Sequence, residues 1–430
     1  MKKSFIITTI LMPLLLLGMS AAPSLVMLFS KSEHRTISVV DETGVIAPAL
    51  QSDSEITFSL AEKPNLQEEL KRSLGSSDFG VLYIGKDAVQ NPNNIMLFTN
   101  ASSSMTIEEK IATQLENAIK SERIKEYDEK LKGLDIPDLK EIMQRVDTKV
   151  HLISMRNGDD GNGLISSTFA GVVGMVLGMM LYFFLAIYGA IVMSSIIEEK
   201  NSRILDVLVS TVRPFEMMMG KIVGVALVAG TQILVWGTLL VVMSAYVLPA
   251  VLPAELMSGI SAIRGGADAS AIAATGANIN LITTLAPLLD TAYIIKIVAL
   301  MLSFMMGGFL LYAAMYAAVG ASVDSPQDAQ QLTMPITVPI FIGLIISMTV
   351  MNDPDSSLVF WCSMIPFTSP IVMMARIPSG IPAWEIATSL VILYATFIIM
   401  VWLAGRVYRV GIFMHGVKPS LKELWRWMRY

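Results

Sequence analysis

Long stretches without charged residues separate the charged segments of this chain. Residues 4–30, 161–197 and 222–254 contain no Asp, Glu, Lys or Arg. Each stretch is longer than the roughly 20 apolar residues with which a helix crosses the hydrocarbon core of a bilayer. The pattern therefore predicts membrane-spanning helices.

The same pattern over the whole chain predicts about six spans, each near the length a bilayer requires. They are residues 1–30, 164–197, 218–248, 286–321, 332–351 and 384–405. Pro335 and Pro339 are expected to break the fifth span, because proline lacks the backbone N–H donor and crowds the preceding turn. The predicted fold class is an all-α polytopic membrane bundle, with an α+β domain inserted between the first and second spans.

The first span has two interpretations. Residues 20–22 (Ser-Ala-Ala) resemble a signal-peptide cleavage site, but the apolar run continues to Phe29. It is therefore longer than the roughly 7–15 apolar residues of a signal peptide. We favour an uncleaved anchor, and Lys2 and Lys3 then place the N-terminus in the cytoplasm.

Residues 31–163 have the composition of a soluble domain, which we expect on the extracytoplasmic side. Alternating or continuous apolar runs predict strands, at residues 36–41, 56–60, 79–85 and 95–99. Helices are predicted over residues 65–74 and 106–132. The second is opened by Thr106 with Glu109 three residues later, a capping-box pattern.

Residues 198–217 form a charged island between the second and third spans. Glu199 and Arg203 lie four residues apart in the acid-first order that stabilises a helix, and apolar residues recur at helical spacing. Pro214 is expected to end this helix. We predict an amphipathic connector that either lies on the membrane surface or docks into a partner.

Residues 322–331 form a second connector. Ser325 is a good helix cap, Pro326 fits the first helical position, and Asp328 favours the positive helix start. Two outer loops are predicted at residues 249–285 and 352–383. The second is rich in proline and has room for a re-entrant segment, provided that protein covers its backbone.

Lys and Arg gather in the charged island and in the tail, residues 406–430. By the positive-inside rule, both connectors and both termini then lie in the cytoplasm.

Composition agrees with a membrane protein: 53% of residues are hydrophobic and 16% charged, against about a quarter charged in soluble domains. The single cysteine, Cys362, excludes an internal disulfide and a multi-cysteine metal site. The three histidines lie far apart in the sequence, which argues against a histidine metal site. No basic domain points to nucleic acid.

The sequence gives little support to an enzyme. It has no phosphate-binding loop, so ATP hydrolysis is not expected from this chain itself. The cores of the predicted spans lack ionisable side chains, which argues against a proton- or ion-driven carrier. Glu198, Glu199 and Arg203 fit the EExxxR pattern of CAAX-type membrane proteases, but such an enzyme would need histidines inside the membrane, and none is predicted there.

The two connectors resemble a known family. Two motifs of type-2 ATP-binding-cassette (ABC) export permeases resemble the first connector. The motif "EEK-x-x-R-x-x-E-x-L" resembles the run Glu198-Glu199-Lys200-Asn201-Ser202-Arg203 with Asp206 and Leu208. The motif "P-x-x-x-x-x-GK" resembles Pro214-Phe215 followed by Gly220-Lys221. Residues 321–330 resemble the second cytosolic loop of that class, and the sodium-efflux branch called NatB is the most similar. Asp206 departs from the family, which often has Glu there.

This resemblance implies a permease subunit of the bacterial inner membrane. A separate NatA-like cytoplasmic ATPase would bind ATP and Mg²⁺. Two permeases, embedded in membrane lipid, would pair with two of these ATPases. The residues implied in coupling to the ATPase are Glu198, Glu199, Arg203, Asp206, Leu208, Asp324, Ser325, Gln327 and Asp328.

Ala170, Gly174 and Gly178 recur every four residues, so helices can approach closely there. Their stripe serves either packing within the chain or a permease homodimer.

The cargo stays open between Na⁺ and a hydrophobic or peptide molecule. Oxygen ligands for sodium are available at Thr231, Gln232, Ser244, Tyr312 and Thr337, although such side chains commonly serve as ordinary hydrogen-bonding groups. The 30 methionines, many of them in the predicted spans, suit adaptable apolar surfaces. The competing function is a non-transporting membrane sensor or scaffold whose outer domain binds a ligand.

Overall fold

The structure of the protein is a computed structural model. It describes residues 35–53, 55–61, 66–74, 78–92, 94–100, 105–130, 150, 153–156, 167–202, 212–264 and 285–414. The predicted first span, most of the loop at residues 249–285 and the end of the basic tail lie outside these residues. So do residues 158–163, whose three glycines predict a flexible hinge before the second span.

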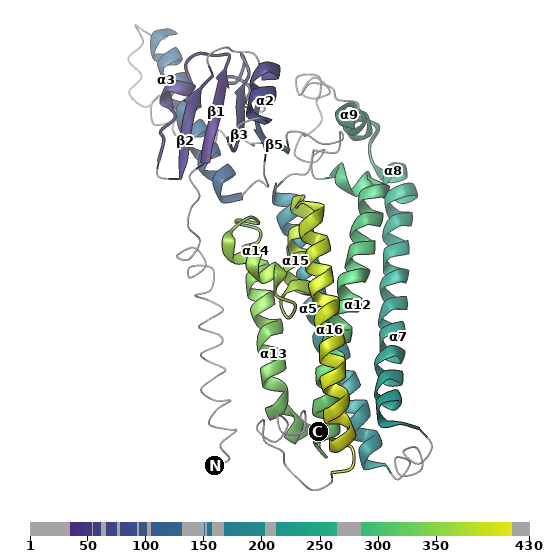
Figure 1. Cartoon of the computed structure of the whole chain (residues 1–430). Coiled ribbons are helices and arrows are strands. Elements are labelled where there is room, and N and C mark those ends of the chain that lie inside the picture. Colours follow the sequence, from purple (N-terminus) through teal and green to yellow (C-terminus); the bar gives the residue numbers. More distant parts are fainter. Residues whose placement is uncertain are drawn as a thin grey trace.

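A sheet domain is formed by residues 35–156 and lies beyond one end of a helical bundle (Figure 1). Its strands are β1 (Arg35–Asp41), β2 (Ile56–Leu60), β3 (Gly80–Ile84), β4 (Ile95–Thr99) and β5 (Ile153–Arg156). They pair in the order β2-β1-β3-β4-β5. Only the β3–β4 pairing is antiparallel; the other three are parallel. The four predicted strands match β1 to β4 closely, and β5 was not predicted.

The helices of this domain are α2 (Leu66–Leu74), α3 (Met105–Lys130) and a short 3-10 turn, η1 (Ala47–Ala49). Ile107, Ile111, Leu115 and Ile119 of α3 recur every four residues and are buried against strand residues such as Leu82. A helix that puts apolar residues on one face in this way buries that face against the sheet. α3 already contains Thr106, so the predicted capping box does not begin this helix.

The bundle contains five helices that are long and apolar enough to cross a membrane, among the residues that the structure describes. They are α5 (Ser167–Asn201), α7 (Pro214–Val242), α12 (Thr291–Ser322), α13 (Pro326–Thr349) and α16 (Ala383–Gly411). α7 continues through the π-turn η2 (Met243–Val247) into α8 (Leu248–Val251), and α9 (Ala254–Arg264) follows. The short turn η3 (Pro287–Leu289) precedes α12.

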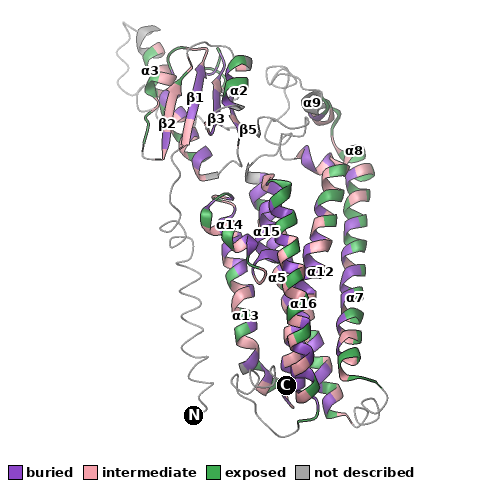
Figure 2. Ribbon diagram, viewed as in Figure 1, coloured by how far each residue is buried: buried purple, intermediate pink, exposed green. Residues whose placement is uncertain are grey.

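α12 is the central helix of the bundle. Half of its most apolar stretch is buried inside the protein, against about a fifth for α7 and for α16. Figure 2 shows the same contrast, with α7 mostly exposed along its outer face. Exposed apolar side chains such as Leu227 and Leu239 suit contact with lipid rather than water.

The two prolines of α13 do not break it. The helix runs without interruption from Pro326 to Thr349, with Pro335 and Pro339 inside it. The prediction of a break at these residues is therefore wrong. Helices in a membrane tolerate proline, because neighbouring helices and hydroxyl side chains satisfy the freed backbone groups.

The charged island begins differently from the prediction. Glu198, Glu199, Lys200 and Asn201 form the last turn of α5 rather than part of a separate helix. Pro214 lies in the first turn of α7. Proline is favoured at this position, because its missing N–H would have no partner in the first turn anyway. The predicted helix before Pro214 falls largely on residues 203–211, which lie outside the described residues.

The predicted outer loop at residues 352–383 contains two short helices, α14 (Ser357–Met364) and α15 (Ser369–Arg376), and the turn η4 (Ile377–Ser379). All eight residues of α15 are buried. α14 and α15 form a hairpin beside α13 and α16, at the end of the bundle nearer the sheet domain (Figure 1). We call this end the sheet end and the opposite one the connector end.

Candidate functional site

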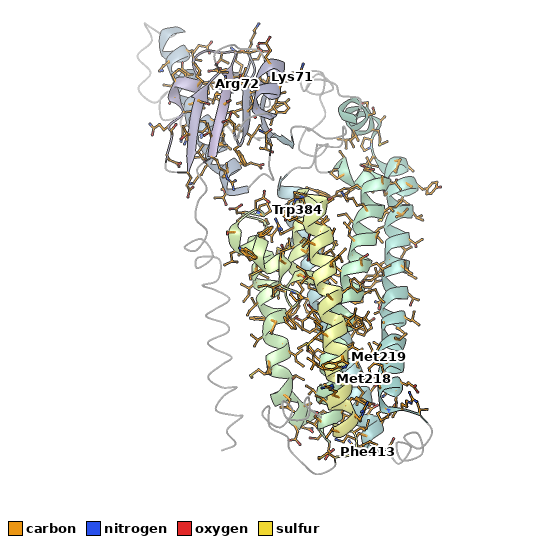
Figure 3. All side chains as sticks on the ribbon, in the orientation of Figure 1. Lys71, Arg72, Met218, Met219, Trp384 and Phe413 are labelled. Carbon is orange, nitrogen blue, oxygen red and sulfur yellow. The ribbon has the colours of Figure 1, made fainter. Side chains whose placement is uncertain are left out.

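The candidate site lies at the connector end, where α5 and α12 stop and α7 and α13 start (Figure 1). The two connectors predicted from the sequence therefore lie at the same end of the bundle. Met218 of α7 and Phe413, just after α16, lie there too, whereas Trp384 at the start of α16 lies at the sheet end (Figure 3).

Lys200 binds the second connector from the last turn of α5. Its side chain is 0% exposed, and its Nζ lies 3.0 Å from Oδ1 of Asp324. The same ammonium donates to the carbonyl oxygen of Ala321 at 2.8 Å. The amide of Asn201 donates to the carbonyl oxygen of Asp324, also at 2.8 Å. We call these four residues the Lys200 clamp.

Glu199 binds α7. Its Oε1 lies 2.7 Å from Nζ of Lys221. Lys221 also donates to the carbonyl oxygen of Ser195 at 2.7 Å and to its hydroxyl at 2.9 Å. These three residues form the Glu199 clamp. Consecutive residues of α5 thus hold two different helix ends.

The start of α13 follows the prediction made for Ser325. The hydroxyl of Ser325 accepts a hydrogen bond from the backbone N–H of Asp328 at 3.3 Å and donates to the Asp328 carboxylate at 2.9 Å. Pro326 occupies the first turn, and Asp328 lies at the positive end of the helix. This capping prediction is confirmed.

The other predicted coupling residues divide into two groups. Glu198 and Gln327 are exposed at this end and are accessible to a partner. Arg203, Asp206 and Leu208 lie outside the described residues. The site residues brought together are therefore Glu199, Asp324, Ser325 and Asp328, with Glu198 and Gln327 at the surface.

Sequence reasoning missed the structural importance of Lys200. It was interpreted only as one of the positive charges on the cytoplasmic side. Its place three residues after the apolar stretch 161–197 is the available signal, because a lysine at the end of a span must either reach the membrane surface or find a partner inside the protein.

The small-residue stripe of α5 faces α15 and α13. A Cβ placed on Gly174 would overlap the carbonyl oxygen of Ala375 in α15. A Cβ on Gly178 would lie 3.1 Å from the Cβ of Ser347 in α13. Ala170 is buried as well. The glycines of this stripe serve packing within the chain, the first of the two roles considered for it.

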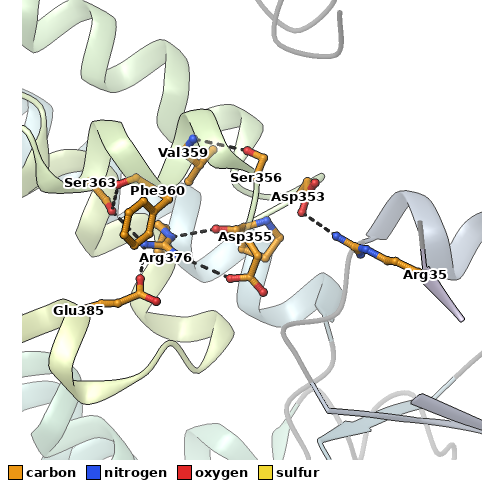
Figure 4. Close-up of polar contacts among 10 residues, drawn as sticks. Arg35, Asp353, Asp355, Ser356, Val359, Phe360, Ser363, Arg376 and Glu385 are labelled. Carbon is orange, nitrogen blue, oxygen red and sulfur yellow. Dashed lines mark hydrogen bonds and ion pairs between the residues drawn. The ribbon is translucent and has the colours of Figure 1, made fainter. Parts of the chain in front are cut away.

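A second polar cluster lies at the sheet end (Figure 4). Arg376 is 1% exposed and donates to the Pro354 carbonyl and the Ser363 hydroxyl, at 2.8 and 2.9 Å. It forms ion pairs with Glu385 at 2.8 Å and with Asp355 at 3.5 Å. We call this the Arg376 cluster. It joins α15, α14, the start of α16 and the turn after α13.

The sequence placed Arg376 in an outer loop, and the structure buries it. A buried guanidinium needs charged and hydrogen-bonding partners, because the cost of removing it from water is large. Those partners come from distant parts of residues 352–385, so no local pattern could reveal them. The cores of the predicted spans lack ionisable side chains, but the structure places this charged cluster at one end of them.

Asp353, next to this cluster, contacts the sheet domain. Its Oδ1 lies 3.3 Å from a guanidinium nitrogen of Arg35 in β1. Burial raises the pKa of the Asp353 carboxyl above its ordinary value, and the charge of Arg35 offsets part of that rise. This ion pair is a direct polar contact between the sheet domain and the bundle.

The oxygen atoms considered as sodium ligands are mostly committed to other groups. Tyr312 donates to the carbonyl of Phe367, Gln232 accepts from Tyr188, and Thr337 donates to the carbonyl of Thr333. Thr231 likewise donates to a backbone carbonyl of its own helix, and only the buried hydroxyl of Ser244 lacks a protein partner among these five. Within the described residues, no group of three or more His, Cys, Asp or Glu could hold a metal ion.

Comparisons with known proteins cover almost the whole chain. The model of one family, described as "ABC-2 family transporter protein", matches residues 3–406. The uncharacterized protein YhaP of Bacillus subtilis is 25% identical over 99% of this chain and 94% of its own length. The uncharacterized protein MJ1024 of Methanocaldococcus jannaschii is 23% identical over 98% of this chain and 92% of its own. No solved structure matches the chain.

Proposed function

The chain belongs to the ABC-2 family of transporter proteins, and from this premise we propose that it is the permease subunit of an ATP-driven exporter. Such permeases normally work with a cytoplasmic ATPase. In this proposal the partner ATPase binds ATP and Mg²⁺ and hydrolyses the nucleotide, and this chain forms the path through the membrane. The connector end then faces the cytoplasm and receives the ATPase.

The observation that carries this proposal is the pair of clamps at the connector end. A displacement of the segment between α5 and α7 would move α5 directly through the peptide chain. It would also move α7 through the ion pair of Glu199, and α12 and α13 through the ion pair of Lys200. A site built in this way passes a rigid-body movement to four helices together. The exposed Glu198 and Gln327 offer polar contacts to the ATPase at the same end.

We favour a hydrophobic or peptide cargo over sodium. Among the described residues no group of three or more His, Cys, Asp or Glu could hold a metal ion, and Gln232 already accepts a hydrogen bond from Tyr188. An ion that loses its water needs several oxygen ligands at once. Methionines such as Met301 and Met305 are buried near the centre of α12, where their flexible side chains could adapt to an apolar cargo that passes between the helices. The narrower resemblance to the NatB branch is kept as a hypothesis only.

The test is to purify the tagged full-length chain from its native cells and measure vanadate-sensitive ATP hydrolysis in the purified complex. We expect an associated ATPase that carries a phosphate-binding loop, and we expect it to be lost when residues 203–211 are replaced by a Gly-Ser linker. Arg35→Ala, at the sheet end, is the matched control and should retain it.

Two results would contradict the proposal. One is the absence of any ATPase from the complex of the unmodified chain, which would favour a membrane sensor or scaffold instead. The other is an ATPase that remains bound when residues 203–211 are replaced.

A further inference from the structure

Two consecutive residues at the end of α5, one acidic and one basic, each form an ionic contact with a different part of the bundle. Glu199 contacts Lys221 of α7, and Lys200 contacts Asp324 after α12. In an α-helix with 3.6 residues per turn, neighbouring side chains point about 100° apart. One rigid turn therefore holds partners on two different sides.

The Lys200 clamp lies at a point where helix backbones meet closely. A Cβ on Gly320 of α12 would lie 2.9 Å from the carbonyl oxygen of Met193 in α5. A Cβ on Gly411 of α16 would lie 2.9 Å from the carbonyl oxygen of Ala321. The Ala321 carbonyl, which accepts the hydrogen bond from Lys200, thus lies where α5, α12 and α16 converge.

Stability alone is a weak explanation for such a pair. Removing the Lys200 ammonium from water offsets much of its attraction to the partly exposed Asp324, so such an ion pair adds little over apolar packing. What a buried pair does provide is a defined register between the parts that it joins. Lys200 has this geometry, because its ammonium is held by the Asp324 carboxylate on the second connector and by the Ala321 carbonyl at the end of α12.

We propose that Lys200 is a positioning residue that makes the two connectors move as one body. With Lys200 in place, a displacement of the α5–α7 connector carries the α12–α13 connector with it. Without it, α7 still follows α5 through the Glu199 clamp, but the start of α13 is held less tightly, through the hydrogen bond from Asn201 to the Asp324 carbonyl. This proposal rests on the proposed function only for the source of the displacement.

The experiment measures distances between spin labels in the full-length chain in lipid nanodiscs. Cys362→Ser removes the one native cysteine. Cysteines are then introduced in pairs at exposed positions: Glu198 with Gln327, which reports on the α5–α13 contact, and Glu198 with Glu216, which reports on the α5–α7 contact.

With Lys200 intact, we expect one narrow distance distribution for each pair. Lys200→Met should broaden the 198/327 distribution and leave the 198/216 distribution unchanged. Lys221→Met is the matched control and should do the reverse. Asp324→Asn is the milder variant, because Asp324 is partly exposed, and it should broaden 198/327 in the same direction even if Lys200→Met folds poorly.

An unchanged 198/327 distribution in Asp324→Asn and in folded Lys200→Met would overturn the proposal. A separate readout distinguishes it from the proposed function. Lys200→Met should keep the ATPase bound but lose the effect of the permease on its rate of hydrolysis. Loss of that binding would mean that Lys200 serves docking instead, whereas absence of an ATPase from the unmodified complex would defeat the proposed function alone.

Discussion

At the scale of single residues, the buried charges of Lys200 and Arg376 depend on partners from other elements of the chain. Arg376 is the clearest case, with two carboxylates, one hydroxyl and one carbonyl around its guanidinium. A buried charge that loses its partner keeps the whole cost of its removal from water. Removing one member of such a pair therefore costs more folding stability than the small net contribution of the intact pair implies.

Replacing Arg376 with Met should lower the stability of the bundle markedly. Glu385 would be left buried without its cation, a change that typically costs about 3–5 kcal/mol. The measurement is the thermal unfolding midpoint of the full-length chain in nanodiscs. Arg409→Met, at an exposed position of the same charge, should leave the midpoint nearly unchanged.

The double variant Arg376→Met with Glu385→Met should recover part of the loss, because neither charge is then buried alone. A midpoint for Arg376→Met equal to that of Arg409→Met would show that the cluster does not stabilise the hairpin.

The surroundings of Asp53 predict that the folded state of the sheet domain loses some stability around β2 at acid pH. The backbone N–H groups of Glu55 and Ile56 donate to its carboxylate, and with Lys110 they hold the pKa of Asp53 below its ordinary 3.8. A carboxyl with a lowered pKa stabilises the folded state above its unfolded pKa, and this contribution is lost as pH falls through the folded value. The contribution of Asp53 should therefore be present at neutral pH and disappear below pH 3.8.

Hydrogen exchange of the peptide around β2, corrected for the intrinsic pH dependence, measures this loss. Protection should fall more steeply between neutral pH and acid in the native chain than in Asp53→Asn. The effect should be small, because Asp53 is close to the surface and exposed ionic contacts contribute little. Identical profiles for the two chains would refute the assignment.

At the scale of elements, the sequence predicted what depends on local patterns. β2 and β4 have the predicted bounds, and the cap at Ser325 follows from the local preferences of Ser325, Pro326 and Asp328. The continuity of α13 through its prolines and the burial of α15 depend on neighbours far along the chain, and no local pattern encodes those neighbours.

The residues predicted to couple to an ATPase show the same division. The motif around Glu198 stands out in the sequence because its charges interrupt long apolar stretches, and in the structure it lies at the same end of the bundle as the second connector. It did not reveal that Lys200 turns inward to Asp324, which is more than a hundred residues later in the sequence.

The close approach of α5 to α15 should make Gly174 intolerant of any side chain. Gly174→Ala would force its Cβ into the carbonyl of Ala375, and such overpacking typically costs about 1–3 kcal/mol. Gly224→Ala in α7 is the matched control, since a Cβ there has nothing within 4 Å. The unfolding midpoint should fall for Gly174→Ala and stay level or rise slightly for Gly224→Ala. An equal response of the two variants would contradict the close packing of α5 against α15.

At the scale of the whole molecule, the chain has two polar ends joined by an apolar bundle. The sheet end holds the Arg376 cluster and the contact between Arg35 and Asp353. The connector end holds the Lys200 and Glu199 clamps. For a permease of the ABC-2 family, this arrangement predicts that the ATPase acts at the connector end and that the sheet domain lies across the membrane from it.

Accessibility of the two ends to a membrane-impermeant maleimide tests this account most directly. In a Cys362→Ser background, a single cysteine is introduced either at Gln327, exposed at the connector end, or at Lys86, exposed in the sheet domain. In intact spheroplasts, the Lys86→Cys chain should react and the Gln327→Cys chain should not. After permeabilisation both should react. Reaction of Gln327→Cys in intact spheroplasts would place the connector end outside the cell and contradict the account.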